Sequence, residues 1–136
     1  MYKIPLVNGI QRTYTNNGQH AEQIFRYTLT GQICKADNTP SWVSGDCNDI
    51  QVKSARATIC KGTNIAAHIE ADAAKAYAYV TADFITAYIM TPVEWLTFTT
   101  TFGTVTRESQ KNGGAEKTRL GKESKAMIEW LKQNAA

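Results

Sequence analysis

Apolar and polar residues alternate with a period of two along several short stretches, as is typical of strands buried on one face. Tyr2, Ile4 and Leu6 alternate in this way ahead of Asn8-Gly9, a dipeptide suited to a type I′ turn. With a return over residues 10–14, they predict a hairpin over 2–14. The stretches 76–80 and 84–90 are rich in Tyr, Val, Ile and Phe and predict two more strands.

Other stretches repeat their apolar residues at helical spacing. The first spans residues 19–30, and a second helix is predicted from Pro92 to Phe102 because Thr91 and Glu94 form a capping-box pattern. Residues 116–120 are predicted to be extended, and a last helix runs over 122–133.

The length and composition are those of one compact domain. A chain of 136 residues with 43% hydrophobic residues has enough apolar material for a single core. The element order predicts a single α+β domain with an N-terminal hairpin over 1–15, a core over 19–90 and a basic, helical C-terminal part over 91–136.

The charge is unevenly distributed. The net charge is only +3, with an isoelectric point near 8.8. From position 107 onward, however, there are seven Lys and Arg residues and only four Glu, so this part is expected to face a polyanion.

The three cysteines, Cys34, Cys47 and Cys60, form no Cys-x-x-Cys pair, and no secretory leader precedes them, which favours a cytoplasmic setting. No apolar run approaches the length of a membrane span, so no membrane association is expected.

A row of polar residues interrupts a predicted strand near the middle of the chain. Asp49, Gln51 and Lys53 share one face of an extended segment, whereas Ile50 and Val52 share the other. Such a row is either the solvated face of an amphipathic strand or a functional site.

The residue types in this row suit metal-assisted hydrolysis of a phosphodiester. Carboxylate and amide oxygens are ligands for Mg²⁺ or Mn²⁺, and a lysine can orient the attacking water and balance developing charge. Because Gln51 brings no negative charge, a further carboxylate from elsewhere in the chain would help to bind the metal. Glu22 on the first predicted helix is the first choice for this ligand, and Asp46 is the next.

These residues resemble the PD-(D/E)xK, or restriction-endonuclease-like, nucleases. Gln51-Val52-Lys53 is similar to the Gln-x-Lys variant of the family motif, and Glu22 matches the glutamate that many members carry on the first core helix. Asp49 is closer to the motif than the family aspartate usually is, so Asp46 or Asp37 is an alternative. The resemblance implies a central mixed β-sheet flanked by helices, with catalytic residues Glu22, Asp49, Gln51 and Lys53.

The resemblance also implies a function, a Mg²⁺-dependent DNA endonuclease, for which cutting both strands favours a homodimer. The alternative is a non-catalytic nucleic-acid-binding or regulatory module of the same fold. The residues expected to contact nucleic acid are all basic, and they are Arg56, Arg107, Lys111, Lys117, Arg119, Lys122 and Lys125.

Overall fold

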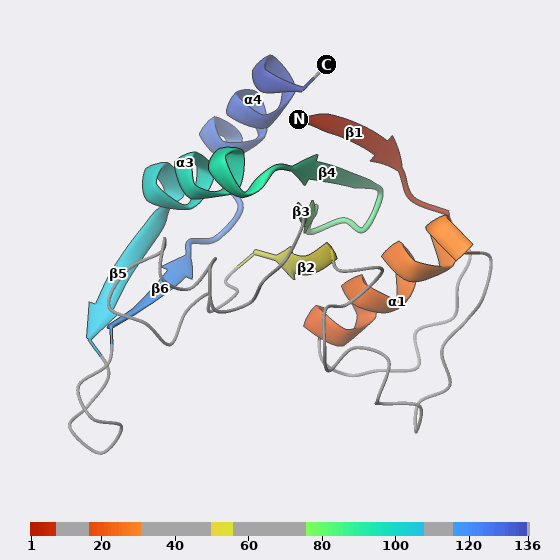
Figure 1. The fold of residues 1–136 in the computed structure, drawn as a ribbon, viewed down its shortest axis with the longest axis horizontal. Helices are drawn as coiled ribbons and strands as arrows, with labels where there is room; N and C mark the ends of the chain where they lie inside the picture. The colour runs from red at the N-terminus through yellow and green to blue at the C-terminus, as the bar shows by residue number, and fades with distance from the viewer. Residues whose placement is uncertain (8–16, 31–49, 56–75, 108–115, 136) are drawn as a thin grey trace.

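A computed structural model of the chain describes residues 1–7, 17–30, 50–55, 76–107 and 116–135 (Figure 1). These residues form a four-stranded sheet, a two-stranded sheet and helices on both faces of the larger sheet. The combination of helices with a mixed sheet confirms the predicted α+β class. Among these residues, no helix has the length and apolarity to cross a membrane.

The larger sheet combines parallel and antiparallel pairing. Its strands are β1 (Tyr2–Pro5), β2 (Ile50–Ser54), β3 (Ala76–Val80) and β4 (Thr86–Met90), in the spatial order β1-β4-β3-β2. β2 runs parallel to β3, whereas β4 is antiparallel to both β3 and β1. β1 therefore pairs with a strand far along the chain, and the return strand of the predicted N-terminal hairpin lies outside the described residues.

A tight turn joins β3 to β4 and explains why β4 begins at Thr86. The Phe84 N–H donates to the Thr81 carbonyl at 2.9 Å, and the Thr81 N–H donates to the Thr86 carbonyl at 3.0 Å. Asp83 accepts through one oxygen from the Thr81 hydroxyl (2.6 Å) and from the Ile85 N–H (3.1 Å). Phe84 has a φ of 59°, which takes it out of the extended conformation predicted for it.

The helices are α1 (Asn17–Thr30), α3 (Pro92–Phe102) and α4 (Lys125–Asn134). They confirm the helices predicted over 19–30 and 92–102, and most of the one predicted over 122–133. The Thr91 hydroxyl accepts from the Glu94 N–H, and the Glu94 carboxylate accepts from the Thr91 N–H, so the capping box is complete.

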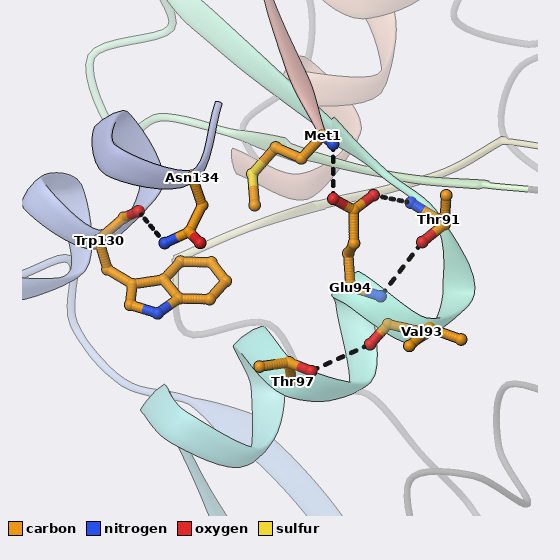
Figure 2. Close-up of polar contacts among 7 residues, drawn as sticks. All are labelled: Met1, Thr91, Val93, Glu94, Thr97, Trp130 and Asn134. Atoms are coloured by element: carbon orange, nitrogen blue, oxygen red, sulfur yellow. Dashed lines mark hydrogen bonds and ion pairs between the residues drawn. The ribbon is translucent and has the colours of Figure 1, made fainter. Parts of the chain in front are cut away.

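Glu94 also connects the start of the chain to α3. Figure 2 shows its second carboxylate oxygen in contact with the Met1 amino group, while the first accepts from Thr91. This amino group lowers the pKa of Glu94, with the hydrogen bond from the Thr91 N–H as the next contribution. The first residue of the described chain is thereby held against the N-terminus of α3.

The helices cover opposite faces of the sheet and bury two separate apolar clusters. On one face α1 packs against alternating residues of the strands; this cluster consists of Leu6, Ala21, Ile24, Phe25, Val52, Ala78, Val80, Ala87 and Ile89. On the other face α3 and α4 cover the strands; this cluster consists of Tyr77, Tyr79, Tyr88, Met90, Trp95, Phe98, Leu120, Met127 and Leu131. The sheet thus lies between two helical layers.

The C-terminal part is not wholly helical, contrary to the expectation for 91–136. β5 (Gly103–Arg107) follows α3 directly and pairs antiparallel with β6 (Glu116–Leu120). The extended stretch predicted at 116–120 is confirmed as β6, whereas β5 was not predicted. Its residues Thr104, Val105 and Thr106 are β-branched and favour extended backbone once α3 ends at Phe102.

Candidate functional site

β2 carries the polar row of the sequence and lies at one end of the described sheet. Val52 is buried, whereas Gln51 and Lys53 are half-buried. Ile50 packs against the same apolar cluster as Val52. The predicted alternation across this strand is therefore confirmed from Ile50 to Lys53, and Asp49 lies outside the described residues.

The register of β2 identifies the face on which the polar row lies. Gln51 is paired with Tyr77 and Lys53 with Tyr79 across the parallel ladder. Adjacent strands place paired residues on the same face of a sheet. Gln51 and Lys53 therefore border the cluster that α3 and α4 cover. Within the described residues, the Lys53 ammonium makes no ion pair or hydrogen bond.

Glu22 belongs to the other side of the sheet. Its helix, α1, contacts β2, and Figure 1 shows the two elements close together. The contact is made by the apolar stripe of Ala21, Ile24 and Phe25, which packs against Val52. Glu22 is half-buried on the flank of this stripe. The helix thus does not bring Glu22 onto the face that carries the polar row, because its own apolar residues select the apolar face of β2.

Glu123 is a carboxylate on the polar row's face of the sheet that sequence reasoning missed. Its Oε2 atom accepts from the Tyr79 hydroxyl at 2.6 Å and from the Ala82 N–H at 2.9 Å. Because Tyr79 is the register partner of Lys53, Glu123 approaches the neighbouring strand on the same face. Its position in a Gly-Lys-Glu-Ser segment gave no signal of this contact, which joins residues 44 positions apart.

Burial raises the pKa of Tyr79 well above its usual value, and the hydrogen bond to Glu123 raises it further. The tyrosine is thus a proton donor to the carboxylate at neutral pH. The two hydrogen bonds to Oε2 tie the segment ahead of α4 to the end of β3. Glu123 accordingly has a structural task in this arrangement.

A Mg²⁺ ion requires several oxygen ligands, preferably with negative charge among them. In the part of the chain that the structure describes, no group of three or more His, Cys, Asp or Glu side chains is arranged to hold a metal. On the face of the polar row, Gln51 offers an uncharged amide oxygen as a ligand atom, two positions from Lys53. The aspartates considered for this role, Asp49, Asp46 and Asp37, lie outside the described residues.

The residues predicted to contact nucleic acid fall into three groups. Arg56 and Lys111 lie outside the described residues. Arg107 and Lys117 lie on the β5–β6 hairpin. The other three are exposed. Arg119 lies near the end of β6, Lys122 lies between β6 and α4, and Lys125 is the first residue of α4.

Comparisons with protein-family models, with curated proteins and with solved structures find no match to this chain.

Proposed function

We propose that the chain is a Mg²⁺-dependent DNA endonuclease whose catalytic strand is β2. The observation that carries the proposal is that Gln51 and the half-buried cation Lys53 share one face of β2, opposite the buried Val52. A lysine ammonium on such a face is stabilised by an anionic partner. A bound phosphate, together with the carboxylate of Asp49, supplies such a partner.

Each residue of the row has a defined task in this proposal. Asp49, or Asp46 in its place, and the Gln51 amide oxygen hold the metal. When bound, the metal polarises a phosphate oxygen and lowers the pKa of a water molecule. Lys53 orients the attacking water and balances negative charge that develops on the phosphate. Glu22, which the family resemblance implies as a further ligand, belongs to the helix that covers the opposite face of the sheet, and it has no task in this proposal.

A homodimer is part of the proposal, because a domain of this size reaches a limited length of duplex, and one active site cuts one strand at a time. A two-fold dimer would place two copies of β2 on the two strands. Sedimentation velocity of the protein on a short duplex tests this point. A complex with two protein chains per duplex is expected, and a strictly one-to-one complex contradicts the dimer.

Cleavage of supercoiled plasmid DNA in Mg²⁺ or Mn²⁺ tests the activity. Wild-type protein is expected to nick or linearise the plasmid, and Lys53→Ala and Asp49→Ala to lose this activity. Lys3→Ala is the matched control, because Lys3 is an exposed lysine on β1, at the other end of the sheet. Equal activity in all four proteins, or activity that survives removal of the metal with a chelator, overturns the proposal.

A second candidate function is a nucleic-acid-binding or regulatory module without catalysis. The observation that favours it is the run of exposed cations at Arg119, Lys122 and Lys125, which does not depend on a metal. This alternative predicts salt-sensitive DNA binding that persists in Lys53→Ala and is lost when Lys117 and Arg119 are reversed to Glu. Binding of that kind, with no cleavage in either metal, would select it over the nuclease.

A further inference from the structure

The β5–β6 hairpin is a two-stranded ribbon that extends away from the main sheet, as Figure 1 shows. Its base is fixed to the core. Leu120 is buried among the residues of α3 and α4, and the Gly121 N–H donates to the Phe102 carbonyl at 3.3 Å. The ribbon therefore leaves the body of the protein from a firm attachment.

The strand register divides the charged positions of the ribbon between its two faces. Thr104 is paired with Arg119, and Thr106 with Lys117. These four positions share one face, because residues two apart along a strand, and residues paired across it, lie on the same side. Thr104 and Arg119 are exposed.

The acidic residue of the ribbon belongs to the other face. Glu116 is paired with Arg107, and the same face continues through Val105 and Thr118 to the buried Leu120. The face of Thr104, Thr106, Lys117 and Arg119, which we name the basic ribbon face, therefore has two cationic positions and no carboxylate position. The register places Thr106 directly across from Lys117, and Thr104 directly across from Arg119.

We propose that this ribbon enters the major groove of duplex DNA with the basic ribbon face toward the nucleic acid. The inference rests on the proposed function, since it presumes that the chain acts on DNA, and it assigns the form of DNA and the element that reads it. Two paired strands lie about 4.8 Å apart, and a major groove about 12 Å wide admits a two-stranded ribbon. Arginine and lysine suit guanine edges and phosphates, and threonine suits base edges or methyl groups.

The residues that follow the ribbon supply further phosphate contacts. Lys122 and Lys125 are exposed and come directly after β6 in the chain. The intervening acidic residue, Glu123, is engaged by Tyr79 and by the Ala82 N–H. These hydrogen bonds hold the Glu123 carboxylate toward β3, and Lys122 and Lys125 add two exposed cations for phosphate contacts between the ribbon and α4.

Fluorescence anisotropy with a labelled duplex tests the proposal. The double variant Lys117→Ala/Arg119→Ala is expected to bind the duplex about tenfold more weakly or worse. The slope of log affinity against log salt concentration is expected to become shallower by about 0.9 for each phosphate that the variant no longer neutralises. Lys132→Ala, an exposed lysine near the end of α4, is the control and is expected to bind like wild type. Equal binding by the double variant and the control overturns the inference.

A second variant tests the same face by adding charge. Thr104→Glu places a carboxylate directly across from Arg119 at an exposed position, so the fold is expected to persist, as circular dichroism and the thermal midpoint would check. Its binding is expected to fall at least as far as that of the double variant. Unchanged binding in a folded Thr104→Glu protein contradicts a DNA-facing role for this side of the ribbon.

Groove-specific competitors test the mode of entry. Methyl green occupies the major groove and is expected to displace the protein, whereas netropsin occupies the minor groove and is not. Displacement by netropsin alone overturns major-groove entry.

The ribbon assignment and the nuclease activity can fail separately. If the ribbon variants lose DNA binding but the wild type does not cleave, the nuclease proposal fails and the ribbon assignment stands. Cleavage that depends on Lys53 but not on the ribbon positions overturns the ribbon assignment alone.

Discussion

Tyr79, at the centre of the sheet, donates its hydroxyl proton to Glu123, and the two oxygen atoms lie 2.6 Å apart. The same carboxylate oxygen accepts from the N–H of Ala82, in the turn that follows β3. Through this pair the segment between β6 and α4 is attached to the strand next to β2. The position of the basic ribbon relative to the candidate catalytic strand therefore depends in part on a buried phenol that stays protonated.

The first prediction concerns stability at alkaline pH. Burial and the bond to Glu123 raise the pKa of Tyr79 above its usual value of 10.0. Below pH 10 both the folded and the unfolded chain keep this proton, so its contribution is fully present there. Above that pH the unfolded chain loses the proton and the folded chain keeps it, so the free energy of unfolding falls by about 1.4 kcal/mol per pH unit for this group.

Urea denaturation at a series of alkaline pH values measures this slope. Tyr79→Phe is expected to have a shallower decline than wild type, although part of the slope remains, because burial also raises the pKa of Tyr88. Tyr2→Phe, which changes an exposed tyrosine, is the control and should keep the wild-type slope. Parallel curves for all three proteins would contradict a proton held by Tyr79.

The second prediction concerns the N-terminus of α3. Thr91→Ala removes the hydroxyl that accepts from the Glu94 N–H, and is expected to lower the free energy of unfolding by about 1 kcal/mol. Thr97→Ala is the matched control on the same helix, because its exposed hydroxyl returns to the Val93 carbonyl (Figure 2) and caps nothing. The control is expected to stay within about 0.5 kcal/mol of wild type. Equal thermal midpoints for both variants would mean that the cap contributes nothing.

The same helix shows why part of the fold could be predicted from the sequence. The capping box lies within four consecutive residues, and strands β3 and β4 have strongly β-forming compositions, so local signals decide these elements. β5 was missed because a helix end and a strand start meet at Gly103 with no intervening turn residues. The position of β1 beside β4 depends on pairing over a long sequence distance, for which the sequence carries no local signal.

The candidate site was predictable only in its local part. Alternation correctly placed Gln51 and Lys53 opposite Val52. Which side of β2 is covered by α1 depends on tertiary packing. The apolar stripe of the helix packs on the side of Val52. The approach of Glu123 to Tyr79 is likewise a product of tertiary packing, since the local sequence of each residue is ordinary.

The third prediction concerns the turn between β3 and β4. Phe84 adopts a φ of 59°, a conformation that costs about 1 kcal/mol for residues with a Cβ and little for glycine. Phe84→Gly and Phe84→Ala both remove the edge-on ring packing against His20, whose ring centroid lies 4.7 Å away. The glycine variant is therefore expected to be more stable than the alanine variant by about 1 kcal/mol. Thermal and urea denaturation of the pair measure the difference, and the reverse order would contradict it.

The last prediction separates the two faces of β2 in the proposed nuclease. Glu22→Gln and Asp49→Asn each replace a carboxylate by the amide of the same shape, so they change the net charge equally. Because α1 packs on the Val52 face, we expect Glu22→Gln to cleave the plasmid within about threefold of the wild-type rate. This corresponds to a rise of less than about 1 kcal/mol in the activation free energy. Asp49→Asn, in the polar row itself, is expected to reduce the rate by about 100-fold or more.

Initial cleavage rates at saturating Mg²⁺ and their dependence on metal concentration distinguish the outcomes. If Asp49→Asn alone needs a higher Mg²⁺ concentration to reach half of its maximal rate, the result supports a site confined to the polar face of β2. A large loss in Glu22→Gln that high Mn²⁺ restores would show that the first helix does supply a ligand, against the separation of faces by the sheet. Full activity in Asp49→Asn would transfer the metal-binding role to Asp46, and Asp46→Asn would then be the inactive variant.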